Sequence, residues 1–155
     1  MNRAIPFIIL AILLAPLCAG QASSAASADS GLPTITFDYV PPIGSFENLA
    51  GHVTNAEPAE YAVAVYIYIS GWWTKPTFQS PTTPIQPDGS WATDITTGGS
   101  DQLATKIAAF LIPIEYAPPL VAGGAVLPAE LYANAAAYTS VNRDEPRTIR
   151  FSGYT

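Results

Sequence analysis

The chain has 155 residues, with 12 acidic against 6 basic side chains and a formal net charge of −6. A negative charge without any cluster of Lys or Arg argues against nucleic acid or an anionic membrane as a partner. The length is sufficient for one domain that buries a hydrophobic core.

Residues 1–22 have the composition of an export signal. Arg3 supplies a positive charge, a short apolar stretch runs from Ile5 to Leu17, and small residues follow. The stretch is too short for a comfortable membrane span, and Leu17 does not fit a lipoprotein signal ahead of Cys18. We therefore expect a secreted protein, extracellular or periplasmic, whose mature chain has no cysteine and no disulfide.

A small, polar segment at residues 23–32 is predicted to be a disordered tether, followed by a folded domain at 33–155. Without Arg3, the chain carries five basic and twelve acidic residues, a net charge of about −7. The first predicted strands of the domain are Thr34–Val40 and Leu49–Asn55, and a turn at 57–59 leads into the next one.

The clearest strand begins at Tyr61 in the segment YAVAVYIYI. β-Branched residues, which favour strands, occupy one face at Val63, Val65, Ile67 and Ile69. The other face carries small residues and then phenols, at Ala62, Ala64, Tyr66 and Tyr68. Two apolar faces indicate a central strand. The Val/Ile face is expected to be core, and a covering segment is expected over the alanines. Gly71 ends the strand, and a loop carrying Trp72 and Trp73 runs to Pro76.

The second half of the chain alternates turns with short strands. Residues 77–84 are rich in Pro and Thr and are predicted to be an edge or irregular segment. A turn at 86–89 precedes a strand at Ser90–Thr96, with Trp91 directed to the core. The remaining predicted elements are a strand at Thr105–Ile112, a long connection at 113–128, a short helix at 128–134, a weak strand at Ala135–Val141 and a last strand at Arg147–Ser152.

Seven or eight short strands with many turns and no long helical period predict an all-β fold. The expected architecture is a single immunoglobulin-like or prealbumin-like β-sandwich.

Three runs of sequence carry a family resemblance: VAVYIYISGWWTKP, IQPDGSWATDITTGGSD and TKIAAFLIP. Together they resemble an uncharacterised β-sandwich module of exported bacterial proteins, versions of which resemble segments attached to secreted glycoside hydrolases. The resemblance covers about residues 47–143, and GWWTKP and DGSW…DITTGGSD are its specific parts. It implies an accessory, carbohydrate-associated role and carries over no catalytic or binding residue.

Catalytic chemistry has little support in the sequence. His52 is the single histidine, and no serine stands in a nucleophile-elbow setting that could use it. The counts of His and Cys exclude a multi-ligand metal site of those residues. Asp88, Asp94 and Asp101 could supply oxygen ligands to calcium, although turn formation explains Asp88 and capping explains Asp101. We expect a protein that is not an enzyme and binds no cofactor.

The candidate binding residues are aromatic. Tyr66, Tyr68 and Trp72 share one face if the strand continues through Gly71, and their rings could then stack on successive sugar units. Trp73 would be the buried anchor and Lys75 would lie at the rim. A bulge at Gly71 would exchange the two tryptophans, and in a further alternative both pack under residues 113–128.

Two function classes remain open. The first is a secreted, non-catalytic module that binds a polysaccharide or a cell-surface glycan. The second is a structural or adhesion protein of the cell envelope that associates with a protein partner. Exposed aromatic residues in a row favour the first class, whereas a broad apolar patch favours the second.

Overall fold

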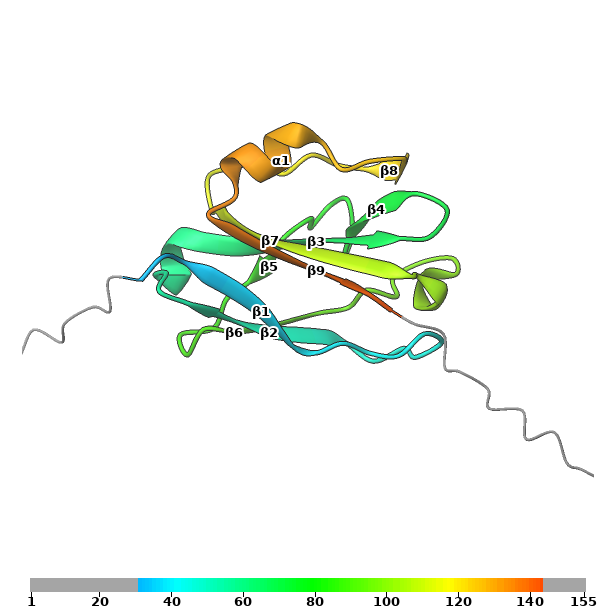
Figure 1. Cartoon of the computed structure of the whole chain (residues 1–155), viewed down its shortest axis with the longest axis horizontal. Helices are drawn as coiled ribbons and strands as arrows, with labels where there is room; N and C mark the ends of the chain where they lie inside the picture. The colour runs from blue at the N-terminus through cyan, green and yellow to red at the C-terminus, as the bar shows by residue number, and fades with distance from the viewer. Residues whose placement is uncertain (1–30, 144–155) are drawn as a thin grey trace, which may run out of the picture.

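The computed structural model describes residues 31–143, which form an all-β sandwich with one short helix (Figure 1). The predicted export signal, most of the predicted tether and the predicted strand at Arg147–Ser152 lie outside the described residues. Residues 31–143 contain nine strands in two antiparallel sheets, so the predicted sandwich is confirmed with more strands than the seven or eight expected.

The smaller sheet has three strands, in the order β1 (Thr34–Tyr39), β2 (Leu49–Thr54) and β6 (Ser90–Thr93). The larger sheet has the order β8 (Ala122–Gly124), β4 (Trp72–Lys75), β3 (Tyr61–Tyr68), β7 (Lys106–Pro113) and β9 (Ala137–Asn142), and β5 (Thr83–Pro84) pairs with the first part of β3. Two 3-10 turns, at Pro58–Glu60 and Asp101–Leu103, precede β3 and β7.

The main core lies between the two sheets. Val63, Val65 and Ile67 of β3 are fully buried and pack in one cluster with Leu49 of β2 and Trp91 of β6. Burial of branched side chains from both sheets supplies the main driving force for their association. The Val/Ile face of β3 and the side chain of Trp91 are therefore core, as the sequence predicted.

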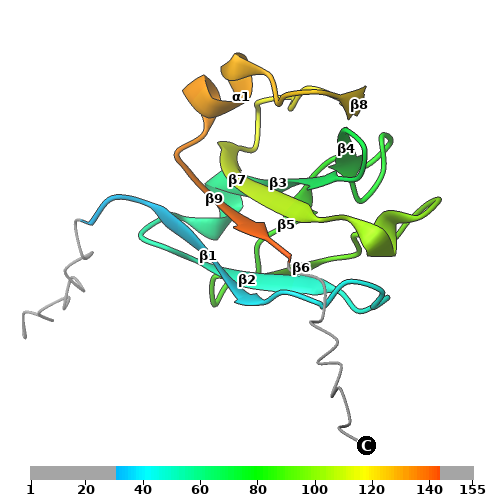
Figure 2. The ribbon, with the colours of Figure 1, turned by 45° about the vertical axis from the view of Figure 1, so that its right-hand side comes forward.

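The opposite face of the larger sheet has a core of its own. Residues 114–136, which include the helix α1 (Ala129–Asn134), lie over this face as a third tier (Figures 1 and 2), except that β8 within this segment extends the larger sheet beside β4. Ala64 and Tyr66 are fully buried beneath this tier, and the Tyr66 hydroxyl donates a hydrogen bond to the Pro119 carbonyl at 2.9 Å. Burial raises the pKa of Tyr66. Two covered faces explain why β3 and β7 are apolar on both sides.

The short helix begins after Pro128, close to the predicted start at that residue, and Leu131 is its buried contact with the sheet. Within the part of the chain that the structure describes, no helix has the length and apolar character needed to cross a bilayer.

Two strands of the larger sheet were not predicted. The chain reverses at Ser70 and Gly71, which have φ angles of 53° and 145°, and residues 72–75 return along β3 as β4. Glycine adopts such angles without steric cost, so the turn forms where the sequence suggested only a strand end. Residues 122–124, predicted to be an irregular connection, pair with β4 as β8.

His52 on β2 has oxygen acceptors at both ring nitrogens. Nδ1 lies 3.1 Å from Asp38 Oδ2, and Nε2 lies 2.9 Å from the Asp88 carbonyl oxygen. A neutral imidazole carries one N–H and can donate to only one of them, whereas the imidazolium donates to both. The hydrogen bond to Asp38, followed by that to the Asp88 carbonyl, therefore raises the pKa of His52. These two contacts give the histidine a structural role.

A pH dependence of stability follows from His52. Because its folded pKa is raised above the unfolded value, its contribution is fully present below about pH 6.5 and is lost as the pH rises through the folded pKa. The charged groups facing the ring are the carboxylates of Asp38 and Asp88. We expect the Tm to fall between about pH 6 and about pH 8, and to fall less in His52→Gln. Equal slopes of Tm against pH in the two proteins would contradict this assignment.

Candidate functional site

A cleft of about 440 Å³ lies where the β3–β4 hairpin meets the loop before β7. Ile69 and residues 73–79 line one side, and residues 97–101 line the other. The two strings that are most distinctive in the sequence, GWWTKP and DITTGGSD, therefore meet in one place. They are far apart in the chain, and the fold brings them together by placing the loop of residues 97–101 against β4.

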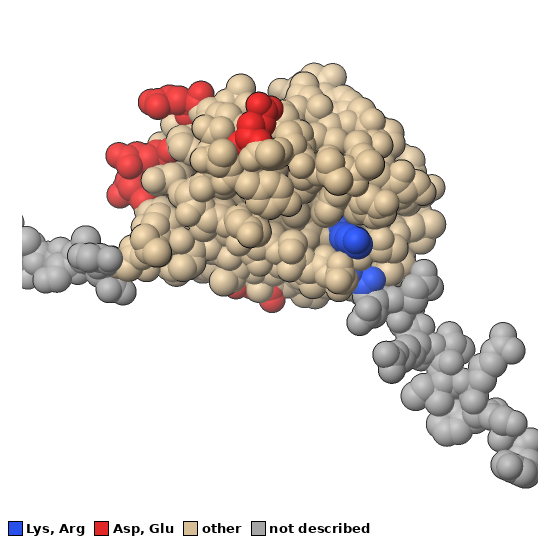
Figure 3. All heavy atoms as spheres, turned by 45° about the horizontal axis from the view of Figure 1, so that its top comes forward, with Lys and Arg blue, Asp and Glu red and all other residues tan. Residues whose placement is uncertain are grey.

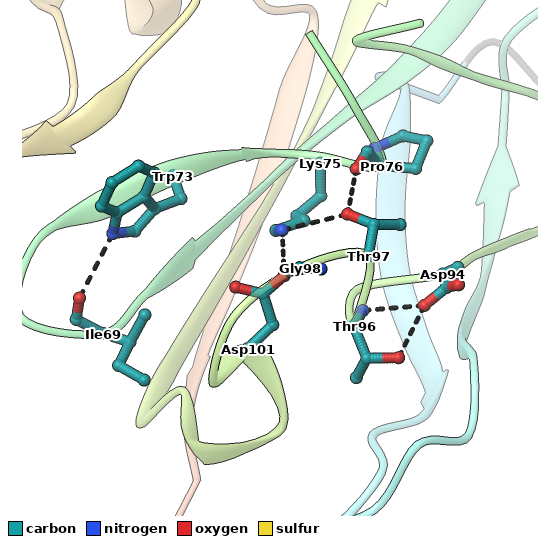
Figure 4. A network of polar contacts seen from close by, with 9 residues as sticks. All are labelled: Ile69, Trp73, Lys75, Pro76, Asp94, Thr96, Thr97, Gly98 and Asp101. Carbon is teal, nitrogen blue, oxygen red and sulfur yellow. Dashed lines mark hydrogen bonds and ion pairs between the residues drawn. The ribbon is translucent and has the colours of Figure 1, made fainter.

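An ion pair between Lys75 and Asp101 holds the two sides of the cleft together (Figure 4). Both residues are buried, and Lys75 Nζ also donates to Thr97 Oγ1 at 3.1 Å. The Thr97 hydroxyl in turn donates to the Pro76 carbonyl, and the Gly98 N–H donates to Asp101 Oδ2 at 2.8 Å. The prediction that Lys75 lies at an exposed rim is wrong, because its ammonium group is enclosed by the loop that supplies Asp101.

Trp73 stands in the wall of this cleft. Its indole Nε1 donates a hydrogen bond to the Ile69 carbonyl at 3.2 Å, as Figure 4 shows. The ring also packs beside Gly123 of β8, where a Cβ would lie 3.3 Å from Cζ2 of the indole. The residue is nevertheless 37 % exposed. Trp73 is therefore held in one orientation while part of its surface remains available to a ligand.

Trp72 points to the opposite face of β4, away from the cleft. It is half-buried, pairs with Tyr68 across the hairpin, and packs on that ring edge-on with centroids 5.4 Å apart. The sequence left open which of the two tryptophans is exposed, and in the structure Trp73 is the more exposed of the two. The register between β4 and β8 shifts between Trp72 and Trp73. The alternative in which both tryptophans pack under residues 113–128 holds only in part. Trp72 packs against the cluster that contains Val121 and Leu127, whereas Trp73, beside Gly123, stays partly exposed.

The predicted row of Tyr66, Tyr68 and Trp72 does not form along one strand. All three lie on the same face of the sheet, but Trp72 is a cross-strand neighbour of Tyr68, and Tyr66 is fully buried. Tyr68 is half-buried, and Lys106 Nζ lies 5.3 Å from the centroid of its ring. Of the five predicted residues, the cleft therefore includes only Trp73 and Lys75.

Phe78 is a cleft residue that the sequence analysis missed. It is exposed and forms part of the wall of the cleft and also of a second hollow of about 360 Å³ that is lined by residues 81–82, 114–118 and Leu120. Phe78 belongs to the Pro- and Thr-rich segment between β4 and β5. An aromatic residue in such a segment has no sheet face on which to be buried. The aromatic side chain in a Pro- and Thr-rich segment was therefore a signal that could have identified Phe78 as a surface residue.

The three aspartates considered as calcium ligands have local roles. Asp88 Oδ1 accepts the Ser90 N–H at 2.9 Å, and Asp94 Oδ1 accepts the Thr96 N–H at 2.7 Å, so each closes a turn. Asp101 pairs with Lys75. Across residues 31–143, no three His, Cys, Asp or Glu side chains are grouped so as to bind a metal ion.

Comparison of the chain with known protein families, with curated proteins and with solved structures gives no match. The resemblance to a module of exported bacterial proteins therefore stays a prediction.

Proposed function

We propose that this protein is a secreted, non-catalytic accessory module that binds carbohydrate in the cleft beside Trp73. The observation that carries the proposal is a partly exposed indole, fixed at the wall of an open cleft whose rim bears neutral polar side chains. A pyranose ring has an apolar C–H face and hydroxyl groups around its edge. The indole provides an apolar surface for the C–H face of the sugar. Thr77, Gln79 and Ser100 provide hydrogen-bonding groups for its hydroxyls.

Pre-organisation of the aromatic wall supports this proposal. The hydrogen bond from Trp73 to Ile69 and the close approach of Gly123 restrict the indole before any ligand arrives. An immobilised side chain loses little conformational entropy on binding, so more of the contact energy appears as affinity. The ion pair between Lys75 and Asp101 similarly fixes the opposite wall.

The test is a pair of adjacent substitutions, Trp73→Ala and Trp72→Ala. An aromatic stacking contact contributes about 0.5–1.5 kcal/mol, so Trp73→Ala should weaken binding to a retained polysaccharide roughly 2- to 12-fold. Trp72→Ala makes the same change one residue away on the opposite face of β4, and its affinity should remain that of the wild type. The measurement is a pull-down on insoluble cellulose, chitin and xylan together with a glycan array, using proteins shown by thermal unfolding to be folded.

Wild-type affinity in a folded Trp73→Ala variant would remove the stacking contact from the proposal. A larger loss in Trp72→Ala than in Trp73→Ala would move the binding surface to the opposite face of the hairpin.

The alternative, an envelope protein that acts by protein association, has one observation in its favour. Phe78, Ile114 and Leu120 are all exposed around the second hollow, and a group of exposed apolar side chains is typical of a contact surface.

Light scattering at increasing protein concentration would favour this alternative if the protein associates and if Leu120→Ser abolishes the association. A monomer that binds glycan at every concentration favours the carbohydrate module.

A further inference from the structure

The charge of the domain restricts the kind of glycan that the cleft can accept. Residues 31–143 contain nine Asp and Glu but only three Lys and Arg, which are Lys75, Lys106 and Arg143. An acidic polysaccharide approaches such a surface against a net repulsion unless a free cation stands at the binding site. The positions of the three basic residues therefore decide whether the cleft can attract an acidic polysaccharide.

Two of the three cations are neutralised or enclosed inside the fold. Lys75 forms the buried pair with Asp101 at the cleft. Arg143 is also buried, and its guanidinium donates hydrogen bonds to the carbonyls of Ala104, Pro41 and Gln102, at 2.7, 3.0 and 3.1 Å. Both groups direct hydrogen bonds to acceptors within the protein itself.

The third cation, Lys106, lies on the wrong face of the sheet to serve the cleft. It pairs with Tyr68 across β3 and β7, and its ammonium lies over the Tyr68 ring. Trp73 pairs with Ile67, so it belongs to the opposite face, because successive residues on a strand alternate in direction. Among the described residues, the cleft has no unpaired cation.

The surface on the α1 side agrees with this distribution. Figure 3 shows most of the acidic atoms of this view toward one end, a few more at the lower edge and basic atoms near the other end, with a broad uncharged surface between them. Within the described part of the chain, this face has no basic patch that could guide a polyanion across the molecule.

We propose that the cleft binds a neutral glycan and discriminates against polymers that carry uronate or sulfate groups; this inference rests on the proposed carbohydrate function. Hydroxyl and amide groups such as those of Thr77, Gln79 and Ser100 both donate and accept hydrogen bonds, which suits sugar hydroxyls. Carboxylates and sulfates are recognised through charged donors, above all Arg, and the one such donor that the described residues place in the cleft, Lys75, is paired with Asp101.

The experiment compares neutral and anionic polymers of matched backbone by native affinity electrophoresis. The pairs are hydroxyethylcellulose with carboxymethylcellulose, arabinoxylan with glucuronoxylan, and fully methyl-esterified polygalacturonate with polygalacturonate. In each pair that retards the protein, we expect the neutral polymer to bind at least about tenfold more tightly than the anionic polymer at low ionic strength. The reason is that the negative charge of the protein repels the anionic polymer. Neutral binding should be the same at physiological ionic strength, since no charge pair contributes to it.

Two variants, each with one added lysine, test whether this discrimination against anionic polymers arises at the cleft. Ser100→Lys introduces a free cation at an exposed position of the rim, and Ser140→Lys introduces one at an exposed position of β9. We expect Ser100→Lys to increase retardation by the anionic member severalfold and Ser140→Lys to leave it unchanged. An equal gain in both variants would overturn the assignment to the cleft.

Two further outcomes separate this inference from the function on which it rests. Tighter, salt-sensitive binding of an anionic member by the wild type would overturn the neutral-glycan inference and would leave the carbohydrate function standing. Absence of retardation in all three pairs, with cellulose, chitin and xylan also failing to retain the protein, would overturn both.

Discussion

Replacing Ile67 by Ala is expected to lower the free energy of unfolding by about 2–5 kcal/mol, as large-to-small changes in a core do. Ile67 is fully buried in the cluster between the sheets, with Ile107 of β7 on one side and Trp73 of β4 on the other. The side chains around Ile67 are held by strand pairing in its own sheet and in the facing sheet, so they cannot easily move into the space that the substitution leaves. Urea unfolding should show a lower midpoint with an unchanged m-value.

The chain offers a matched control in Ile114→Ala. Ile114 follows β7 and is 62 % exposed, so the same substitution should change stability by no more than about 0.5 kcal/mol. A similar loss in both variants would show that the effect of Ile67→Ala does not come from core packing. A negligible loss in Ile67→Ala would contradict its position between the sheets.

The sequence could predict the sandwich because its main signals are local. Alternation of Val and Ile from 63 to 69 identifies one buried face of β3, and the turn at 86–89 sets the start of β6. Each of these features depends on residues that are close together in the chain. The covering tier was predicted only in part, since small residues at 62 and 64 indicated that something packs there without indicating what.

The hairpin between β3 and β4 was the most consequential element that the sequence analysis missed. A rule that assigns alternate residues to alternate faces holds only while the strand continues, and Ser70 and Gly71 end it. The Ser-Gly dipeptide between two apolar runs was a turn signal of the kind that marks hairpins. Because the chain reverses there, Tyr68 and Trp72 became neighbours across two strands, and the extended row of rings was lost.

Part of the candidate site was beyond local reasoning. The sequence singled out Trp73, but the role of Lys75 depends on Asp101, 26 positions later in the chain. A lysine is rarely buried without a partner, and residues 71–76 contain no acidic side chain, so the sequence favoured an exposed position for Lys75. Only the folding of residues 97–101 over β4 converts it to a buried ion pair, and no feature of residues 71–76 indicates that contact.

The buried pair itself gives the second large prediction. Lys75→Met keeps much of the side-chain volume but leaves the Asp101 carboxylate buried, with the Gly98 N–H as its remaining hydrogen-bond donor among the described residues. Removing one partner of a buried ion pair costs about 3–5 kcal/mol, because the remaining charge is uncompensated. We expect a loss of this size in urea unfolding. Lys106→Met, the same change at the exposed lysine over Tyr68, should cost no more than about 1 kcal/mol.

A double-mutant cycle with Asp101→Asn separates the pair from the packing of its members. The amide oxygen of Asn can still accept the Gly98 N–H, and without Lys75 no buried charge remains. The double variant Lys75→Met/Asp101→Asn should therefore be more stable than the sum of the two single losses predicts, by about 1–3 kcal/mol. Additive losses would mean that the two side chains contribute separately. In that case the loop of residues 97–101 is held against β4 by its backbone contacts and by Thr97, and the wall of the cleft opposite Trp73 would not depend on the ion pair.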